Sequence, residues 1–139
     1  MKPRTLSRLD MLAAEQERQW LDAIRRASAT LKQTEQQRGV LAAYRGRLAA
    51  SWQDGAVLPA AQARRAAQFI TASHGAEAQI DQTAAQAEKQ LEASITGLAQ
   101  IRARRHTLSG MQRKAATQAE REAERRQERD IPFHRPIRP

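Results

Sequence analysis

Apolar residues recur every three or four positions along two long stretches of this chain, a spacing that puts them on one side of an α-helix. The first stretch covers residues 5–51 and the second covers residues 59–129. Residues 52–58 break the pattern, and residues 130–139 follow it. We therefore predict an all-α fold in one domain: a two-helix antiparallel coiled-coil hairpin with a longer C-terminal helix, a turn at 52–58 and a flexible tail at 130–139.

Local signals set the ends of the two predicted helices. Thr5 or Ser7 can act as the N-cap of the first helix. The Asp54-Gly55 pair is a turn signal, because glycine readily adopts the left-handed conformation that ends a helix. Pro59 suits the first turn of the second helix, where its missing N–H is not needed. Three prolines after residue 131 end helical structure.

The apolar stripe predicts which residues form the seam between the helices. Between Leu31 and Leu41 the seam is polar, because Thr34, Gln37 and Arg38 fill the gap. The predicted seam of the first helix is Leu6, Leu9, Ala13, Trp20, Ile24, Ala27, Leu31, Leu41, Tyr44 and Leu48. That of the second helix is Ala66, Phe69, Ser73, Ala76, Ile80, Ala84, Ala87, Leu91, Ile95, Leu98, Ile101, Leu108, Met111 and Ala115.

The turn also predicts a register. If it centres near residue 55, the numbers of facing residues add to roughly 110, because both helices rise equally. Leu6 then lies opposite about residue 104. The second helix overshoots the first by roughly 20–25 residues, or about 30–40 Å. Tyr44 and Phe69 lie near each other, close to the turn.

Composition favours a thin seam over a globular core. The chain is 40% hydrophobic, yet it holds only two Trp, one Tyr and two Phe, so little apolar area is available for burial. It has no cysteine and therefore no disulfide or thiol chemistry. No run of about 18 apolar residues could span a membrane, and the first residues lack the apolar core of a signal peptide. We expect a cytosolic protein.

The net charge of +9 is unevenly distributed. Residues 1–100 hold 13 Lys or Arg against 10 Asp or Glu, whereas residues 101–139 hold 11 against 5. On the predicted register, most of the basic excess lies on the helix that overshoots, at Arg102, Arg104, Arg105, Arg113 and Lys114. Such an excess favours acidic partners: nucleic acid, anionic lipid or an acidic protein surface.

The motifs of common enzyme classes are missing from the sequence. It contains no Walker-type phosphate loop, no G-x-G-x-x-G, no HExxH and no CxxC. The three histidines, His74, His106 and His134, are far apart along the chain and cannot share a metal. A two-helix hairpin also offers no enclosed pocket. We therefore expect a protein that is not an enzyme, with no catalytic residues, cofactor or metal, and whose function lies on its surface.

Several residues allow both a structural and a functional interpretation. Tyr44 and Phe69 either plug the turn end of the hairpin or form an exposed anchor for a partner, since aromatics dominate interface hot spots. Trp52 has the same ambiguity, whereas Trp20 is expected in the seam. The glycines inside the predicted helices are either tolerated losses of helix propensity or points of bending and close approach; these are Gly39, Gly46, Gly75 and Gly97.

Two segments carry a family resemblance. Residues 33–45, Gln-Thr-Glu-Gln-Gln-Arg-Gly-Val-Leu-Ala-Ala-Tyr-Arg, resemble a Gln-Ala-Glu-x-Gln…Leu…Tyr pattern that precedes the turn in FliJ and YscO-like proteins. Residues 68–70, Gln-Phe-Ile, are similar to a segment that follows the turn in that family. Size, basic charge and two unequal helices extend the resemblance over nearly the whole chain.

The resemblance implies the stalk of a type III export ATPase complex, flagellar or virulence-associated. In that family the chain ends enter the hole of a hexameric ATPase, and the half near the turn touches the cytoplasmic domain of an FlhA-like export gate. The positions that match the gate-binding set are Gln37, Leu41, Tyr44, Phe69 and Ala76, and Leu48, Ser73 and Ile80 depart from the pattern. Acidic pore loops of the ATPase would hold the basic set from Arg102 to Lys114. Secretion chaperones are a further candidate partner, and membrane association would come only through partners.

Two other functions remain open from the residues alone. A basic helical nucleic-acid binder would show a steep salt dependence, although no aromatic residues alternate with the basic ones as they do at single-strand binding sites. A self-associating coiled-coil scaffold would pair two chains in place of the intramolecular hairpin. The export stalk is the preferred hypothesis, with the nucleic-acid binder and the scaffold as alternatives and no nucleic acid among its partners.

Overall fold

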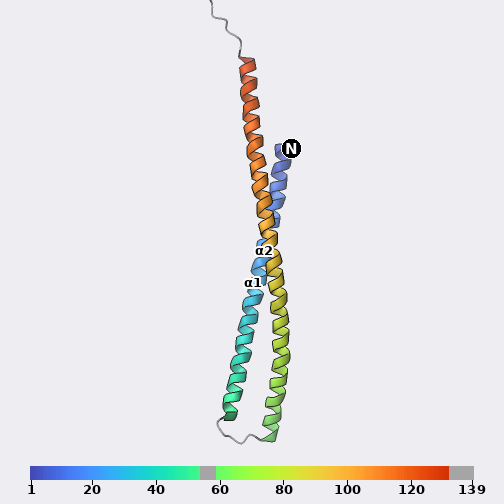
Figure 1. The fold of residues 1–139 in the computed structure, drawn as a ribbon, viewed down its shortest axis with the longest axis vertical. Coiled ribbons are helices and arrows are strands. Elements are labelled where there is room, and N and C mark those ends of the chain that lie inside the picture. The colour runs from blue at the N-terminus through green and yellow to red at the C-terminus, as the bar shows by residue number, and fades with distance from the viewer. Residues whose placement is uncertain (54–58, 132–139) are drawn as a thin grey trace, which may run out of the picture. The chain divides into compact units, whose positions relative to one another are not determined.

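The computed structural model describes residues 1–53 and 59–131, which form two long helices, α1 (Pro3–Gln53) and α2 (Ala60–Asp130) (Figure 1). The chain packs as two compact units, each of which pairs a segment of α1 with a segment of α2. The terminal unit contains Met1–Arg18 and the chain from Leu98 onward. The turn unit contains Gln19–Gly97. The prediction of an all-α helical hairpin is confirmed, and no described helix is long and apolar enough to cross a membrane.

The helix ends differ slightly from the prediction. The N-cap prediction at Thr5 or Ser7 is wrong, because α1 begins at Pro3 and the Lys2 carbonyl accepts hydrogen bonds from the N–H groups of Thr5 (3.0 Å) and Leu6 (3.1 Å). Pro3 fits there because the first helical turn needs no N–H from it. In the same way as the Lys2 carbonyl, the Pro59 carbonyl accepts hydrogen bonds from N–H groups in the first turn of α2. This helix begins one residue later than predicted.

Other predictions fall on parts that are not described. Residues 54–58 and 132–139, which contain the Asp54-Gly55 turn signal and the tail prolines, lie outside the described residues, as do the side chains of Trp52 and Gln53. The helix α2 continues to Asp130, and the Ile131 N–H still donates to the Gln127 carbonyl at 3.0 Å. The helix α1 therefore extends two residues beyond the predicted 5–51 at each end, and α2 lies one residue later than the predicted 59–129.

The residues that turn inward follow a heptad spacing of alternating three and four without interruption, which is the seam of a coiled coil. In α1 they are Leu6, Asp10, Ala13, Glu17, Trp20, Ile24, Ala27, Leu31, Thr34, Arg38, Leu41, Arg45 and Leu48. In α2 they are Ala66, Ile70, Ser73, Glu77, Ile80, Ala84, Ala87, Leu91, Ser94, Leu98, Ile101, Arg105, Leu108, Gln112 and Ala115. Charged residues therefore occupy seam positions that the apolar stripe did not include.

Some predicted seam residues are exposed instead. In α1 the correction concerns Leu9, Tyr44 and Gln37, and in α2 it concerns Ala76, Ile95 and Met111. Trp20 holds a seam position, yet 36% of its surface is exposed. The six exposed residues lie one position beside the seam, and Trp20 is too large to enter it. The spacing of apolar residues alone does not distinguish either case from a buried seam residue.

The core differs between the units. In the terminal unit the buried side chains are apolar: Leu6, Ala13, Leu98, Ile101 and Leu108. In the turn unit they are mostly small, and three are polar: Thr34, Ser73 and Ser94. Each of these three hydroxyls donates to a carbonyl of its own helix, at 2.7–2.8 Å, so burial leaves no hydroxyl without a partner.

The register differs from the prediction. Contacts between the helices join Arg105 to Asp10 and Glu17 in one unit, and Arg38 to Asp81 in the other, so facing residue numbers add to roughly 115–122 rather than 110. Leu6 accordingly lies beside Met111 and Ala115, not near residue 104. The difference arises because the contacts centre near residue 60, whereas the prediction centred the turn near residue 55; only the contact of Tyr44 with Phe69, at a sum of about 113, lies close to the predicted value.

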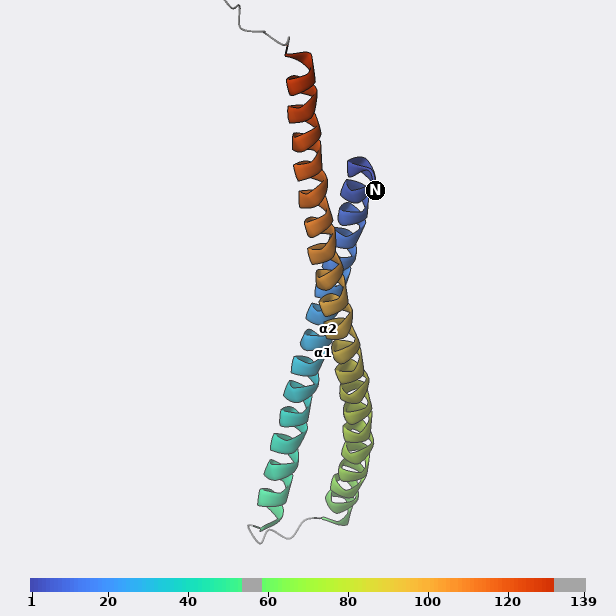
Figure 2. The same cartoon turned by 45° about the horizontal axis from the view of Figure 1, so that its top comes forward.

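The prediction of a long, basic extension of α2 beyond the N-terminus is also wrong in both length and charge. In the terminal unit Met1 shares a hollow with Gln118, and α2 continues beyond the N-terminus in both views (Figure 1 and Figure 2). Every described residue from 116 to 131 is exposed. The part of α2 past this hollow is therefore 119–130, about 18 Å of helix rather than 30–40 Å. It carries four arginines and five carboxylates, so it is not basic.

Candidate protein-binding surfaces

The terminal unit has an ion-pair side. The Glu17 carboxylate accepts from Arg105 Nη1 at 2.6 Å and from Arg102 Nε at 3.1 Å, and Arg105 Nε also donates to Asp10 at 3.1 Å. Glu17 and Arg105 occupy seam positions, which brings their side chains together across the helix pair. The hydrogen bonds from Arg105 and then Arg102 hold the pKa of Glu17 below its usual range. Hydrogen bonds to Asp10 and Glu17 raise the pKa of Arg105, so that guanidinium stays charged.

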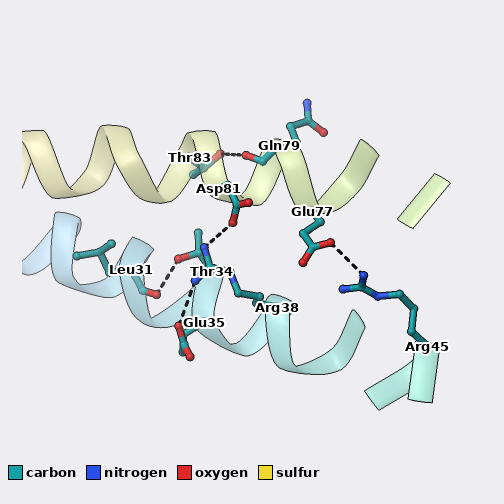
Figure 3. Close-up of polar contacts among 9 residues, drawn as sticks. All are labelled: Leu31, Thr34, Glu35, Arg38, Arg45, Glu77, Gln79, Asp81 and Thr83. Atoms are coloured by element: carbon teal, nitrogen blue, oxygen red, sulfur yellow. Dashed lines mark hydrogen bonds and ion pairs between the residues drawn. The ribbon is translucent and has the colours of Figure 1, made fainter. Parts of the chain in front are cut away.

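The turn unit has its own ion-pair side (Figure 3). Arg38 Nη2 lies 2.7 Å from Asp81 on α2, and its Nη1 lies 3.5 Å from Glu35 on α1. Arg45 Nη1 lies 3.1 Å from Glu77, whose carboxylate is also 3.9 Å from His74 Nδ1. Arg45 Nε is buried without a hydrogen-bond partner among the described residues. Both arginines occupy seam positions, so the seam of this unit contains ion pairs as well as small side chains.

The other side of the turn unit is hollow. A groove of about 660 Å³ runs between the helices there. Four glutamines line it together with aliphatic side chains. The groove is lined by Gln33, Gln36, Gln37, Val40, Leu41, Ala76, Gln79, Ile80 and Thr83. We call this side, which includes Tyr44 and Phe69, the groove side of the turn unit.

Tyr44 and Phe69 are in contact, as predicted. Their ring centroids lie 4.7 Å apart with the planes tilted by 44°, an arrangement that aromatic pairs favour. The Arg47 guanidinium carbon lies 5.8 Å from the Tyr44 centroid, which adds a cation–π contact. Tyr44 remains 48% exposed, whereas Phe69 is half-buried. The pair therefore does not seal the turn unit; it presents a tyrosine to solvent beside Gln37 and Leu41 on the same helix.

Gln37, Leu41 and Ala76, three of the five residues named by the family resemblance, line one groove, and the remaining two, Tyr44 and Phe69, stack on each other. The three positions that depart from the family pattern have different surroundings. Ser73 is buried and bonded to the Ile70 carbonyl, and Leu48 is half-buried in the seam, so both contribute chiefly to packing. Only Ile80 among the departures lines the groove.

The basic set predicted for an ATPase is dispersed. Arg102 and Arg105 are engaged with carboxylates on the ion-pair side of the terminal unit. Arg104 lines a hollow on the other side with Leu9 and Leu108, and Lys114 lines a second hollow with Met1 and Met111. Arg113 is exposed. These five residues therefore do not form one patch on a free helix.

Of the glycines inside the helices, Gly97 has a structural reason, which is the packing of Trp20 against it. The indole lies against Gly97 so closely that an added Cβ would come within 2.6–2.7 Å of ring atoms Cζ2 and Cδ2. Gly97 therefore permits a close approach. A Cβ at Gly39, Gly46 or Gly75 would meet no atom within 4 Å, so those glycines are tolerated losses of helix propensity in the described structure.

Among the residues that the structure describes, no group of His, Asp or Glu side chains is arranged to hold a metal ion. No protein-family model matches the chain, and no match was found among curated proteins or solved structures. The surfaces of the two units are therefore the features from which a function can be argued.

Proposed function

We propose that this chain is a FliJ- or YscO-like stalk of a bacterial type III protein export apparatus, a protein without catalytic activity of its own. It would bind the hexameric export ATPase, promote its assembly or activity, and link it to the cytoplasmic domain of the export gate. Secretion chaperones would be further partners, and the protein would be cytoplasmic and peripheral to the inner membrane through these contacts. The observation that carries the proposal is that three of the five residues of the expected gate-binding set line one groove of the turn unit and the other two stack on each other in the same unit.

The chemistry of that side suits a protein partner. An exposed tyrosine fixed by an aromatic neighbour offers a large contact area with little loss of conformational freedom. The glutamines along the groove can donate and accept hydrogen bonds at the rim of an interface, and Leu41 and Ile80 supply its apolar centre. The ion pairs lie on the opposite side of the unit, so partner binding would not require breaking them.

The ATPase contact is proposed for the terminal unit, because the resemblance assigns the chain ends to the ATPase. In the part of this unit where the helices pair, residues 1–18 and 98–118, six cations have no carboxylate within ion-pair distance among the described residues, and they favour acidic loops. They are Lys2, Arg4, Arg8, Arg104, Arg113 and Lys114.

A matched pair of alanine substitutions tests the gate contact. Ala76→Arg places a long side chain in the groove, whereas Ala78→Arg changes another exposed alanine, which does not line it. We expect calorimetric titration with the purified cytoplasmic domain of the gate to show at least about tenfold weaker binding for Ala76→Arg and no change for Ala78→Arg. Equal affinities for the two variants, or no binding by the wild type, would rule out this surface as the gate contact.

The ATPase role has a separate readout. The purified protein should raise the rate of ATP hydrolysis by its cognate export ATPase, and the two should co-purify. Absence of both effects would refute the stalk proposal even if the gate domain binds. Gene neighbourhood would distinguish a flagellar from a virulence system, because genes of this family lie beside that of the ATPase.

A further inference from the structure

The terminal unit also has a groove side, which shares Arg104 and Lys114 with the proposed ATPase contact. A hollow of about 260 Å³ is lined by Leu9, Leu12, Ala13, Gln16, Arg104 and Leu108. A second one, of about 170 Å³, is lined by Met1, Leu6, Met111, Lys114, Ala115 and Gln118. Both hollows lie between the helices, on the side opposite the Glu17 ion pairs. Each has an apolar floor and one cation at its edge.

The apolar residues around these hollows are unusually exposed. Leu12 is 63% exposed, and Leu9 and Met111 are each 37% exposed, although each could have been polar at no cost to the seam. Contiguous exposed apolar side chains bordered by charge are typical of binding surfaces. In the terminal unit they lie beside the core residues Leu6, Ala13 and Leu108, so the apolar interior continues out to the surface.

The charge of the terminal unit indicates which kind of partner would bind it. Its helix-paired part, residues 1–18 and 98–118, holds nine Lys or Arg and three Asp or Glu. All three carboxylates are already engaged: Asp10 with Arg105, Glu17 with Arg102 and Arg105, and Glu15 with Arg18. The other six cations, including Arg104 and Lys114, have no carboxylate partner among the described residues, so this surface attracts a partner that brings its own.

The spacing of the hollows selects the shape of the partner. They are separated by roughly eight residues along both helices, or about 12 Å at helical rise. Two apolar side chains at i and i+7 or i+8 of a third helix are the same distance apart, so one helix could fill both hollows. A flat lipid surface could cover the exposed leucines but could not fill the hollows.

We propose that the groove side of the terminal unit is a docking site for an amphipathic helix of another protein, with large apolar residues on one face and Asp or Glu beside them. The exposed segment 119–130 of a second copy does not offer such a helix, because it contains no large apolar residue. The inference does not depend on the export function, and its test uses no export component.

The probe is a fluorescent synthetic helix of about five turns with Leu at i and i+7 and Glu at the flanking positions, and fluorescence anisotropy measures its binding to the full chain. Leu12→Gln with Arg104→Gln changes the hollow. The matched control is Met11→Gln with Arg113→Gln, since Met11 is 69% exposed, Arg113 is also exposed, and neither lines a hollow. We expect at least about tenfold weaker binding for the first double variant and less than about twofold for the control.

Three outcomes would overturn the proposal. Equal weakening by both double variants would mean that general charge attraction binds the probe. Equal binding of a probe in which Lys replaces Glu, or Ser replaces Leu, would remove the charge or the apolar argument. Binding that is stronger to anionic vesicles or to duplex DNA than to the acidic helix, and that depends on Leu12 and Arg104, would assign the surface to that other class of partner. Circular dichroism of each variant checks that the helices are intact.

Discussion

The terminal unit and the turn unit place an arginine at the same kind of seam position, with different results. Arg105 uses two of its nitrogens to reach two carboxylates on α1, and Glu17 in turn holds a second arginine, so the network is closed. Arg45 reaches only Glu77, and its Nε is buried without a hydrogen bond among the described residues. Arg105 therefore has carboxylate partners for two of its nitrogens, whereas Arg45 has a carboxylate partner for only one. The reason is that only the terminal unit has a second carboxylate one heptad from the first.

The surrounding cores follow the same contrast. Large aliphatic side chains are buried around Arg105, whereas small or polar ones are buried around Arg45. Burying less apolar area lowers local stability, and less stable regions are commonly those that bind and adapt to partners. We therefore expect the turn unit to open more easily than the terminal unit, although both belong to the same pair of helices.

The largest expected effect comes from removing a matched isoleucine in each unit. Ile101 is buried in the terminal unit, and Ile80 holds the equivalent seam position in the turn unit but is half-buried. We expect Ile101→Ala to lower the free energy of unfolding by about 2–4 kcal/mol and Ile80→Ala by about half as much, because the buried site loses more contacts. Urea denaturation measures both. An equal or larger loss for Ile80→Ala would contradict the contrast between the cores.

A second pair of variants tests the close approach of Trp20. Gly97→Ala must push the indole away, so we expect a net loss of about 1–2 kcal/mol after the gain in helix propensity. Gly75→Ala adds a methyl to open space and should instead stabilise the protein by about 0.5–1 kcal/mol. Thermal unfolding measures the two shifts. The same sign for both variants would mean that Trp20 moves aside freely.

Much of the fold could be predicted from the sequence because a helix has a fixed period. Apolar spacing and good helix formers located both helices to within two residues at each end. The α1 start was missed because Pro3 removes one N–H that the first turn does not need, whereas the prediction relied on a side-chain cap at Thr5 or Ser7. The contact between Tyr44 and Phe69 was also predictable, since both lie close to the turn.

The surfaces could be predicted less well. Asp10, Glu17, Arg45 and Arg105 occupy seam positions only because they find partners across the helix pair, and pairing depends on a register that the sequence of one helix does not contain. The position of the turn could not give that register, since the contacts between the helices centre near residue 60 and not on residue 55. Each hollow is lined by residues of both helices, so the hollows could not be identified before the register was known.

A third experiment replaces each ion pair by leucines. Arg45→Leu with Glu77→Leu removes a partly buried pair and an unsatisfied nitrogen, so we expect a gain of about 1 kcal/mol in the free energy of unfolding. Arg105→Leu with Glu17→Leu should be destabilising, because Asp10 and Arg102 lose their partners. Chemical denaturation at neutral pH compares them. If both double variants stabilise the protein, the network of the terminal unit is no better satisfied than that of the turn unit.

The smallest expected effect is the pH dependence that the closed network adds. The pKa of Glu17 is lowered in the folded protein, first by Arg105 and then by Arg102. Its contribution to stability is therefore present above the usual glutamate range and disappears as the pH falls through the lowered pKa. The melting temperature should fall less between pH 7 and pH 3 in Glu17→Gln than in the wild type. Glu15→Gln, which breaks an exposed pair with Arg18, controls for the loss of one carboxylate. Parallel acid profiles for the wild type and Glu17→Gln would show that the network contributes nothing at neutral pH.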